Sequence, residues 1–202
     1  MSSNYEKIIV DNLNSIYENT PNDLEGLLPA RREGDLFYFR AFGEDCCLGP
    51  NNISFSGIPE KGPKGLLISL YAIHALPAPI RLDPYKSFKD LPNSMPYWGA
   101  FSKNSEQVLT PHVNNIHKNM KSIIDLFRGE TAPRSLSGDF SFVLYPLPKI
   151  ALCYIFYLAD EDFPSSCTCL FSSNVLEFMP LDGLADVGEY TAKRIIEIIN
   201  LK

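Results

Sequence analysis

Residues 140–158 read FSFVLYPLPKIALCYIFYL, the most apolar part of the chain with a turn in its middle. Its first part predicts a strand, because Phe140, Phe142 and Leu144 alternate with Ser141, Val143 and Tyr145. The next four residues, Pro146-Leu147-Pro148-Lys149, have the composition of a turn. The last part, Ile150 to Leu158, is apolar without alternation, which is typical of a strand covered on both faces. The stretch therefore predicts a hairpin with one deeply buried strand.

The flanking sequence adds further strands and several helices. A third strand is predicted at Cys167 to Phe171. A closing helix follows, in which apolar or small residues recur at helical spacing: Leu184, Val187, Gly188, Thr191, Ile195, Ile198 and Ile199. Three short runs separated by turn residues predict an antiparallel meander at 36–42, 46–48 and 53–55. Other helices are predicted at 3–17 with Ser3 as cap, from Thr20-Pro21 to Leu28, at 63–76 and within 108–127.

These elements predict an α+β fold: an antiparallel or mixed sheet of about six short strands with helices packed on it. A chain of 202 residues fits one domain with a well-buried core. We therefore interpret 1–202 as a single α+β domain, with an N-terminal helical segment at 1–30 and the main body at 31–202.

The charge balance bears on the possible partners. The chain has 18 Lys and Arg against 24 Asp and Glu, a formal net charge of −6, and its basic residues are scattered. Such a surface releases few counterions from phosphates, so we predict no binding to nucleic acid. The same acidity argues against binding an anionic membrane surface.

Targeting signals and cysteines bear on the compartment. The first six residues do not form the basic region and apolar core of a signal peptide, and the longest apolar run, 150–158, is far shorter than the ~20 residues of a membrane-spanning helix. Five cysteines, an odd number, fit reduced thiols in a reducing compartment. We predict a cytoplasmic protein that does not cross a membrane.

Three stretches carry a resemblance to a known family. They are Leu91 to Phe101 (LPNSMPYWGAF), Asp160-Glu161-Asp162-Phe163-Pro164, and Met179 to Ala185 (MPLDGLA) before the final helix. The chain from about Leu36 onward resembles the family of uncharacterised proteins catalogued as domain of unknown function 3786, found in anaerobic bacteria and archaea. The resemblance implies a cytoplasmic protein of anaerobic metabolism without an assigned activity. Some longer relatives carry an added iron–sulfur domain, which hints at redox or one-carbon metabolism.

The cysteines do not form a standard metal site. Cys167 and Cys169, two apart on a strand, project to one face, whereas the adjacent Cys46 and Cys47 project to opposite faces. Structural zinc sites favour a gap of two to four residues within each pair, and neither pair has one. We predict no bound metal, with the cysteines as small buried side chains, and the sequence leaves the cofactor unknown.

One hypothesis for function is catalytic. Asp160, Glu161 and Asp162 form the densest carboxylate cluster, and a loop at the end of a strand could present them for acid–base chemistry. The chain has three histidines, His74, His112 and His117, without the spacing of a metal motif. The alternative function is therefore a small enzyme that uses these carboxylates with a histidine brought near by folding. A solvated turn explains the same acidic residues.

The favoured hypothesis is ligand binding by the segment 77–101. This segment contains Pro77, Pro79, Pro84, Pro92 and Pro96 among many aromatic residues, and a loop this long in a compact domain is commonly functional. Rigid aromatic residues beside a few polar groups make good walls for a flat organic ligand. We predict that Tyr97, Trp98, Phe101 and Arg81 bind the ligand and that Tyr97 or Trp98 lines the principal pocket. The same residues would also cap an open end of the core. The favoured function is a non-catalytic accessory protein that binds a small molecule, a cofactor or a protein partner.

Overall fold

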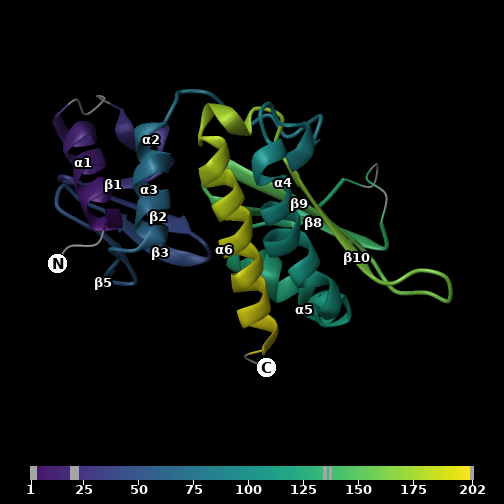
Figure 1. The fold of residues 1–202 in the computed structure, drawn as a ribbon. Coiled ribbons are helices and arrows are strands. Elements are labelled where there is room, and N and C mark those ends of the chain that lie inside the picture. The colour runs from purple at the N-terminus through teal and green to yellow at the C-terminus, as the bar shows by residue number, and fades with distance from the viewer. Residues whose placement is uncertain (1–3, 19–22, 134–135, 137, 201–202) are drawn as a thin grey trace.

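The computed structural model describes residues 4–18, 23–133, 136 and 138–200, and it has an α+β fold as predicted. Among these residues the strands form two antiparallel sheets of five strands each, instead of one sheet of about six. The two sheets lie side by side along the molecule, each with its own helices (Figure 1). The predicted caps Ser3 and Thr20 lie outside the described residues, and the single-domain assignment stays a prediction.

The first sheet is built from consecutive strands. Its order is β1-β2-β3-β4-β5, and the meander predicted from the sequence forms its centre. Alternation along β2 buries Phe37, Phe39 and Ala41 on one face. Two helices, α1 and α3, pack against this part of the chain, and Asn12 Nδ2 donates a hydrogen bond to Ser69 Oγ at 2.9 Å between them. The bounds are α1 (Asn4–Glu18), α2 (Leu24–Leu27), β1 (Arg31–Glu33), β2 (Leu36–Ala41), β3 (Glu44–Leu48), β4 (Ile53–Phe55), β5 (Ile58–Pro59) and α3 (Pro63–Ile73).

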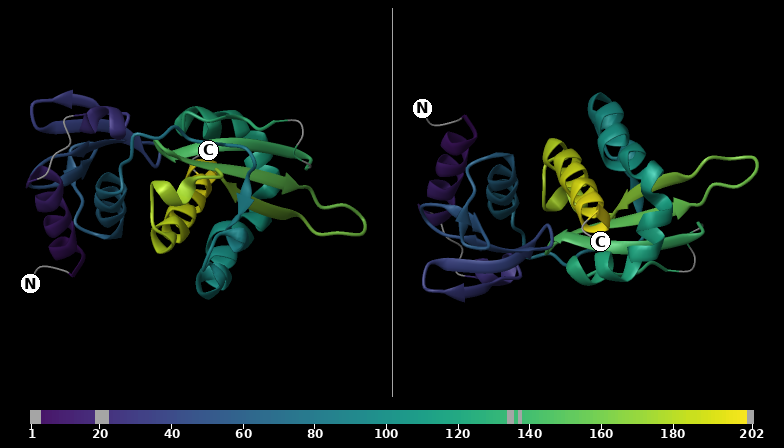
Figure 2. Two further views of the ribbon diagram at one scale, coloured as in Figure 1. Left: turned by 90° about the horizontal axis from the view of Figure 1, so that it is seen from above. Right: turned by 90° about the horizontal axis from the view of Figure 1, so that it is seen from below.

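The second sheet is built around the hairpin of residues 140–158. Its order is β6-β10-β9-β8-β7, which places β9 at the centre. Residues 150–156 of β9 are all buried, which confirms that this strand is covered on both faces. The connection from β9 to β10 extends beyond the rest of the sheet (Figure 2). The bounds are β6 (Lys86–Ser87), β7 (Glu130–Thr131), β8 (Phe140–Leu147), β9 (Ile150–Tyr157) and β10 (Ser166–Phe171).

Different layers cover the two faces of this second sheet. Helices α4 (Met95–Phe101), α5 (Val113–Leu126) and α6 (Leu181–Asn200) lie on one face (Figure 1). On the other face Val143, Ala151, Cys153 and Ile155 form a smaller cluster. No described helix covers that cluster; the irregular segments around it supply Ile80, Leu82, Tyr85 and Leu136. The proline-rich segment before Lys86 therefore covers part of this face of the sheet.

The segment 77–101 is more regular than the sequence predicted. It contains β6, a 3₁₀ helix at Phe88–Asp90 and the helix α4. Pro96 lies in the first turn of α4. The backbone N–H groups of a first turn make no intrahelical hydrogen bond, so a proline, which lacks an N–H, is tolerated there. The helix therefore tolerates a residue that the sequence analysis treated as part of a loop. Pro111 lies in a 3₁₀ helix (Gln107–His112) directly before α5, so it leads into that helix.

The two sheets meet at their turns. The Phe42 N–H in the β2–β3 turn donates to the Pro146 carbonyl in β8 at 2.7 Å. The buried Lys149, in the β8–β9 turn, donates from Nζ to the Leu76 carbonyl at 2.6 Å, just after α3. The Phe42 ring also packs against Tyr190 of α6, with ring centroids 5.9 Å apart. These contacts join the sheets at one side and leave a pocket beside them.

Candidate ligand-binding site

A pocket of about 780 Å³ lies where the first sheet meets the β8–β9 turn and the end of α5. This volume is within the range of small-molecule sites. Its residues come from segments far apart in the sequence: Pro29, β1 to β3, the C-terminal end of α5, and the strand and turn at Tyr145 and Pro148. The pocket therefore exists only because the two sheets are packed together.

The floor of the pocket is apolar. Phe127 lines it and is 2% exposed. Phe39 and Cys46 also line the pocket, but they pair across β2 and β3 with their side chains on the opposite face of the sheet from Tyr38. Burial raises the pKa of the Cys46 thiol well above its ordinary value, so this side chain is neutral. The rings of Tyr38 and Tyr145 form part of the wall. A hydrophobic or aromatic group would therefore find a surface of matching character here.

Three arginines also line the pocket, and their environments differ. Arg31 is ion-paired with Glu33, and its guanidinium carbon lies 4.9 Å from the centre of the Tyr38 ring. Arg40 is ion-paired with Asp45 at 2.8 Å and also donates to the Gly43 carbonyl. The exposed guanidinium of Arg128 has no hydrogen-bond or ion-pair partner in the described part of the chain. One of the three positive charges is therefore available to a ligand.

The sequence-predicted ligand residues on α4 lie elsewhere. Phe101 is 1% exposed and stacks on Phe88 with ring centroids 4.2 Å apart, inside the core. Trp98 is half-buried, with its ring 6.4 Å from that of Phe101, and Tyr97 is exposed. None of these residues lines the 780 Å³ pocket or the second pocket, of about 140 Å³, beside Tyr190. The prediction that Tyr97 or Trp98 lines the principal pocket is wrong for these two pockets, because α4 packs Phe101 into the core and leaves Tyr97 on the surface away from both of them. A role for these side chains in surface binding stays a prediction.

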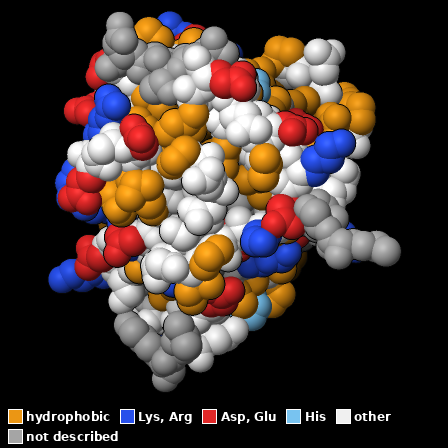
Figure 3. Space-filling view, turned by 90° about the vertical axis from the view of Figure 1, so that its left-hand side faces the viewer, with side chains coloured by type: hydrophobic (Ala, Val, Ile, Leu, Met, Phe, Trp, Pro, Cys, Tyr) orange, Lys and Arg blue, Asp and Glu red, His pale blue; other side chains and the backbone are white. Residues whose placement is uncertain are grey.

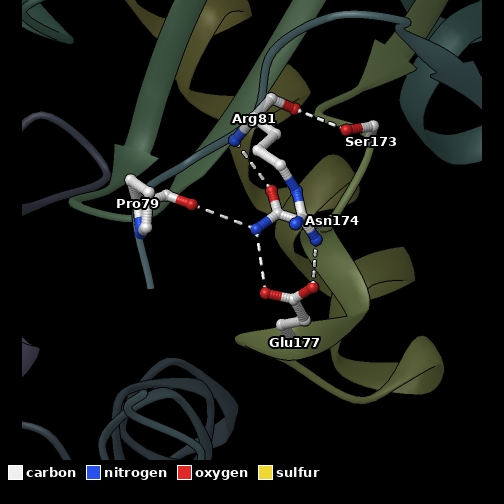
Figure 4. Close-up of polar contacts among 5 residues, drawn as sticks. All are labelled: Pro79, Arg81, Ser173, Asn174 and Glu177. Atoms are coloured by element: carbon white, nitrogen blue, oxygen red, sulfur yellow. Dashed lines mark hydrogen bonds and ion pairs between the residues drawn. The ribbon is translucent and has the colours of Figure 1, made fainter. Parts of the chain in front are cut away.

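Arg81 belongs to a polar clamp between the proline-rich segment and the turn after β10 (Figure 4). Its N–H donates to Asn174 Oδ1 at 2.8 Å, and its guanidinium is ion-paired with Glu177. Asn174 Nδ2 donates to the Pro79 carbonyl at 3.1 Å and to Glu177 at 3.0 Å. The Arg81 carbonyl accepts from the N–H and the hydroxyl of Ser173. The contacts of Arg81 in the structure thus hold a loop in place, and ligand binding by it stays a prediction.

The acidic residues form a turn between β9 and β10. Asp160 Oδ1 accepts hydrogen bonds from the N–H groups of Asp162, at 2.9 Å, and Phe163, at 2.7 Å. All three carboxylates, Asp160, Glu161 and Asp162, are exposed. This geometry is typical of an Asx turn. It favours the solvated-turn interpretation, while catalysis by these residues stays a prediction.

Two of the three histidines, His74 and His117, contact other residues in the described part of the chain. His117 on α5 stacks on Phe140, with ring centroids 4.5 Å apart. His74 Nδ1 lies 2.9 Å from the Leu70 carbonyl at the end of α3, and His112 is half-buried before α5. Within the described residues, no three His, Cys, Asp or Glu side chains are placed to hold a metal ion. As predicted, Cys46 and Cys47 face opposite sides of β3, and Cys167 and Cys169 are buried on one side of β10.

The distribution of charge on the surface and the length and polarity of the helices test the predictions about nucleic acid and membranes. On the face shown in Figure 3, acidic and basic side chains are interspersed around hydrophobic ones, without a basic stripe. This face lacks the electrostatic footprint of a nucleic-acid site. Among the described residues, every helix is too short or too polar to cross a membrane.

A buried carboxyl group that the sequence analysis did not single out lies under the second sheet. Glu106 ends a π-helix (Ser102–Glu106) and is 7% exposed. Its Oε1 accepts a hydrogen bond from the Cys169 N–H at 3.0 Å. Since the short edge strand β6 pairs only with Leu170 and Phe171, the carboxyl group supplies the partner that a longer strand would have given Cys169.

The surroundings of Glu106 favour its neutral form. Burial raises the pKa of this carboxyl group, and the hydrogen bonds from Cys169 and Ser102 oppose the shift only in part. Burial also raises the pKa of the Cys167 and Cys169 thiols nearby. The folded protein therefore binds the Glu106 proton more tightly than the unfolded chain does, and the stability that this group contributes is complete below the ordinary carboxyl pKa and is lost as pH rises through the raised value.

We expect Glu106→Gln to be at least as stable as the wild type at pH 7, because it keeps an acceptor for the Cys169 N–H without a buried charge. The variant should also lose less stability than the wild type as pH rises from 4 to 7 in urea unfolding. Glu106→Ala leaves that N–H unpaired and should lose about 1–3 kcal/mol. A Gln variant as unstable at pH 7 as the Ala variant would contradict this account.

Comparison with known proteins gives one match. A family model described as a domain of unknown function (DUF3786) matches residues 20–194. This match covers most of the chain, including both sheets and the residues of the pocket. No curated protein and no solved structure matches the chain.

Proposed function

The chain belongs to the family of the domain of unknown function DUF3786, and we propose that it is a non-catalytic protein whose small-molecule ligand occupies the pocket between the two sheets. The observation that carries this proposal is the pocket itself, with its volume of about 780 Å³, apolar floor and polar rim. Such a combination is typical of ligand sites, in which apolar surface supplies affinity and a few polar groups fix orientation.

The contacts at the pocket support binding more than catalysis. Asp45, the carboxylate among its lining residues, is paired with Arg40. The tyrosine hydroxyl of Tyr145 donates to Glu130 at 2.8 Å, and burial raises its pKa, so it is not a base at neutral pH. General acid–base catalysis needs a titratable group poised near the working pH, and the Tyr145 hydroxyl is not such a group.

The proposal leaves the metabolic setting as a prediction. The resemblance seen in the sequence implies anaerobic redox or one-carbon metabolism in the cytoplasm, and the chemical identity of the ligand would test that setting. The small enzyme that uses Asp160, Glu161 or Asp162 remains the alternative. It would need substrate turnover that a triple Asn variant at these positions abolishes.

We expect natively purified protein to release a small molecule in mass spectrometry, and the same molecule, added back, to raise the melting temperature. At a ligand concentration 100 times the Kd the added stability is about 2.7 kcal/mol, or a shift of about 5–10 °C for a chain of this size. Tyr38→Ala should weaken this shift, since its ring is part of the pocket wall.

Trp98 separates the two candidate sites, because it is the single tryptophan of the chain and does not line the pocket. A ligand in the pocket should leave Trp98 fluorescence nearly unchanged, and Tyr97→Ala should bind it normally. Saturable quenching of Trp98 that is lost in Tyr97→Ala would move the site to α4. If nothing is released and a metabolite library gives no melting shift, the proposed function is wrong.

A further inference from the structure

Resting on the proposed function, we propose that the ligand joins an apolar, planar body to one anionic group, and that this group pairs with the Arg128 guanidinium. The anionic group can be a carboxylate, a sulfonate or a phosphate ester, since each accepts hydrogen bonds from a guanidinium in the same way. The body lies against Phe127 and the ring of Tyr38.

The count of free charges leads to a single anionic group. Arg31 and Arg40 line the pocket with Arg128, but each of the first two already has a carboxylate partner, Glu33 or Asp45. A ligand group that recruited either would have to displace an ion pair within the protein. Arg128 has no such partner among the residues described, so its charge-assisted hydrogen bonds are all available.

The backbone at Arg128 gives a second, independent reason to assign it a function. Helix α5 ends in a Schellman motif: the Gly129 N–H donates to the Ile124 carbonyl at 2.8 Å, and the Arg128 N–H to the Asp125 carbonyl at 3.3 Å. Arg128 is therefore the residue in left-handed conformation, with φ of 51°. Glycine is favoured at this position because a Cβ atom strains it. An arginine there reduces stability, and an observed backbone outlier of this kind points to a functional side chain.

The rest of the lining selects the ligand's body. Phe127 offers no side-chain hydrogen bond at the floor, while the Tyr38 ring and Pro148 contribute flat surface at the sides. A polar body such as a sugar would leave its hydroxyl groups unpaired on this floor, which is costly. An aromatic or fused-ring body buries apolar area there instead.

Two fluorescent probes with the same ring system test the proposal on the full chain, freed of any bound ligand. The first, 1-anilinonaphthalene-8-sulfonate, carries one sulfonate; the second, N-phenyl-1-naphthylamine, is its neutral counterpart. We expect the anionic probe to bind at one saturable site at least about tenfold more tightly, the effect of one charge-assisted hydrogen bond. Phenyl phosphate and phenylacetate should each displace it, and their ratio tells whether a phosphate or a carboxylate suits the site better.

The decisive variant is Arg128→Gly. It should bind the anionic probe at least about tenfold more weakly and the neutral probe as the wild type does, while its melting temperature rises by about 2–4 °C because glycine relieves the left-handed backbone. Arg128→Gln should show the same loss of binding without the rise. Arg32→Gln removes an equal charge from a residue that does not line the pocket, and it should bind both probes normally.

The outcomes separate this inference from the proposed function. Equal binding of both probes, unchanged in Arg128→Gly, overturns the anionic group and leaves a binding pocket. Equal weakening in Arg32→Gln would show that net charge, not Arg128, attracts the probe, and this also overturns the inference. If neither probe binds at a saturable site, the pocket does not take planar ligands and the inference is wrong, whereas the proposed function fails only if the release and melting experiments also find no ligand.

Discussion

Replacing Phe101 by alanine is expected to lower the free energy of unfolding by about 3–5 kcal/mol, the range measured for large-to-small changes of a buried phenylalanine. Phe101 is 1% exposed, stacks on Phe88 at 4.2 Å and lies tilted against Phe171 at 5.5 Å between ring centroids. The α6 backbone also approaches it so closely that a Cβ on Gly188 would lie 2.6 Å from its ring. Removing the ring therefore opens a cavity that three elements line.

Urea unfolding of Phe101→Ala and Trp98→Phe separates the structural role of this helix from a binding role. Trp98 is half-buried and packs on the edge of the same cluster, so its replacement by a smaller aromatic ring should cost less than about 1.5 kcal/mol. A Phe101→Ala protein that unfolds like the wild type would mean that Phe101 is not part of the core, and the helix would again be a candidate for ligand binding.

Asn174→Ala is expected to lower the free energy of unfolding by about 2–4 kcal/mol, because it removes three part-buried hydrogen bonds of about 1 kcal/mol each. Asn174 is 6% exposed, and it bonds to the Arg81 N–H, the Pro79 carbonyl and Glu177 (Figure 4). Its loss should release the proline-rich segment from the second sheet, exposing the cluster around Val143 and Cys153.

Limited trypsin digestion measures this release directly, since Arg81 and Lys86 are cleavage sites within the segment. Asn174→Ala should be cut there faster than the wild type at equal protease. Ser173→Ala is the matched control: it loses the hydroxyl bond to the Arg81 carbonyl but keeps the N–H bond of 2.7 Å to the same atom, so a loss near 1 kcal/mol is expected. Equal loss and equal cleavage in the two variants would show that Asn174 does not hold the clamp.

Local pattern in the sequence was enough to find the elements whose residues pair or pack with near neighbours. The meander at 36–55, the hairpin at 140–158 and the final helix all formed, although the hairpin turn is Pro148-Lys149 alone and β8 includes Pro146 and Leu147 of the predicted turn. In each of them side-chain periodicity reports which face is buried, and periodicity is a property of adjacent residues. The same pattern showed that β9 is covered on both faces, although it did not show what covers it.

The helix α4 was not predicted, because its prolines were interpreted as evidence of a loop. Pro92 and Pro96 were treated as signs of an irregular loop, yet Pro96 stands in the first turn of the helix, where it is well tolerated. The aromatic residues were correctly noticed as unusual for a connector. Their explanation at Phe101 is core packing, which depends on Phe88 and Phe171, 13 positions before and 70 positions after it in the sequence.

The sequence by itself determined that the chain folds as α+β, which segments become strands and helices in its two most regular parts, and which cysteines share a face. Only the tertiary structure divided the strands into two sheets and placed Arg31, Arg40 and Arg128 around one apolar floor. It also showed that two of these charges are already paired while Arg128 has no partner among the described residues. The physical reason is that local periodicity fixes which side of an element is apolar, whereas this pocket arises from the packing of segments as far apart as Pro29 and Pro148, 119 positions in the sequence.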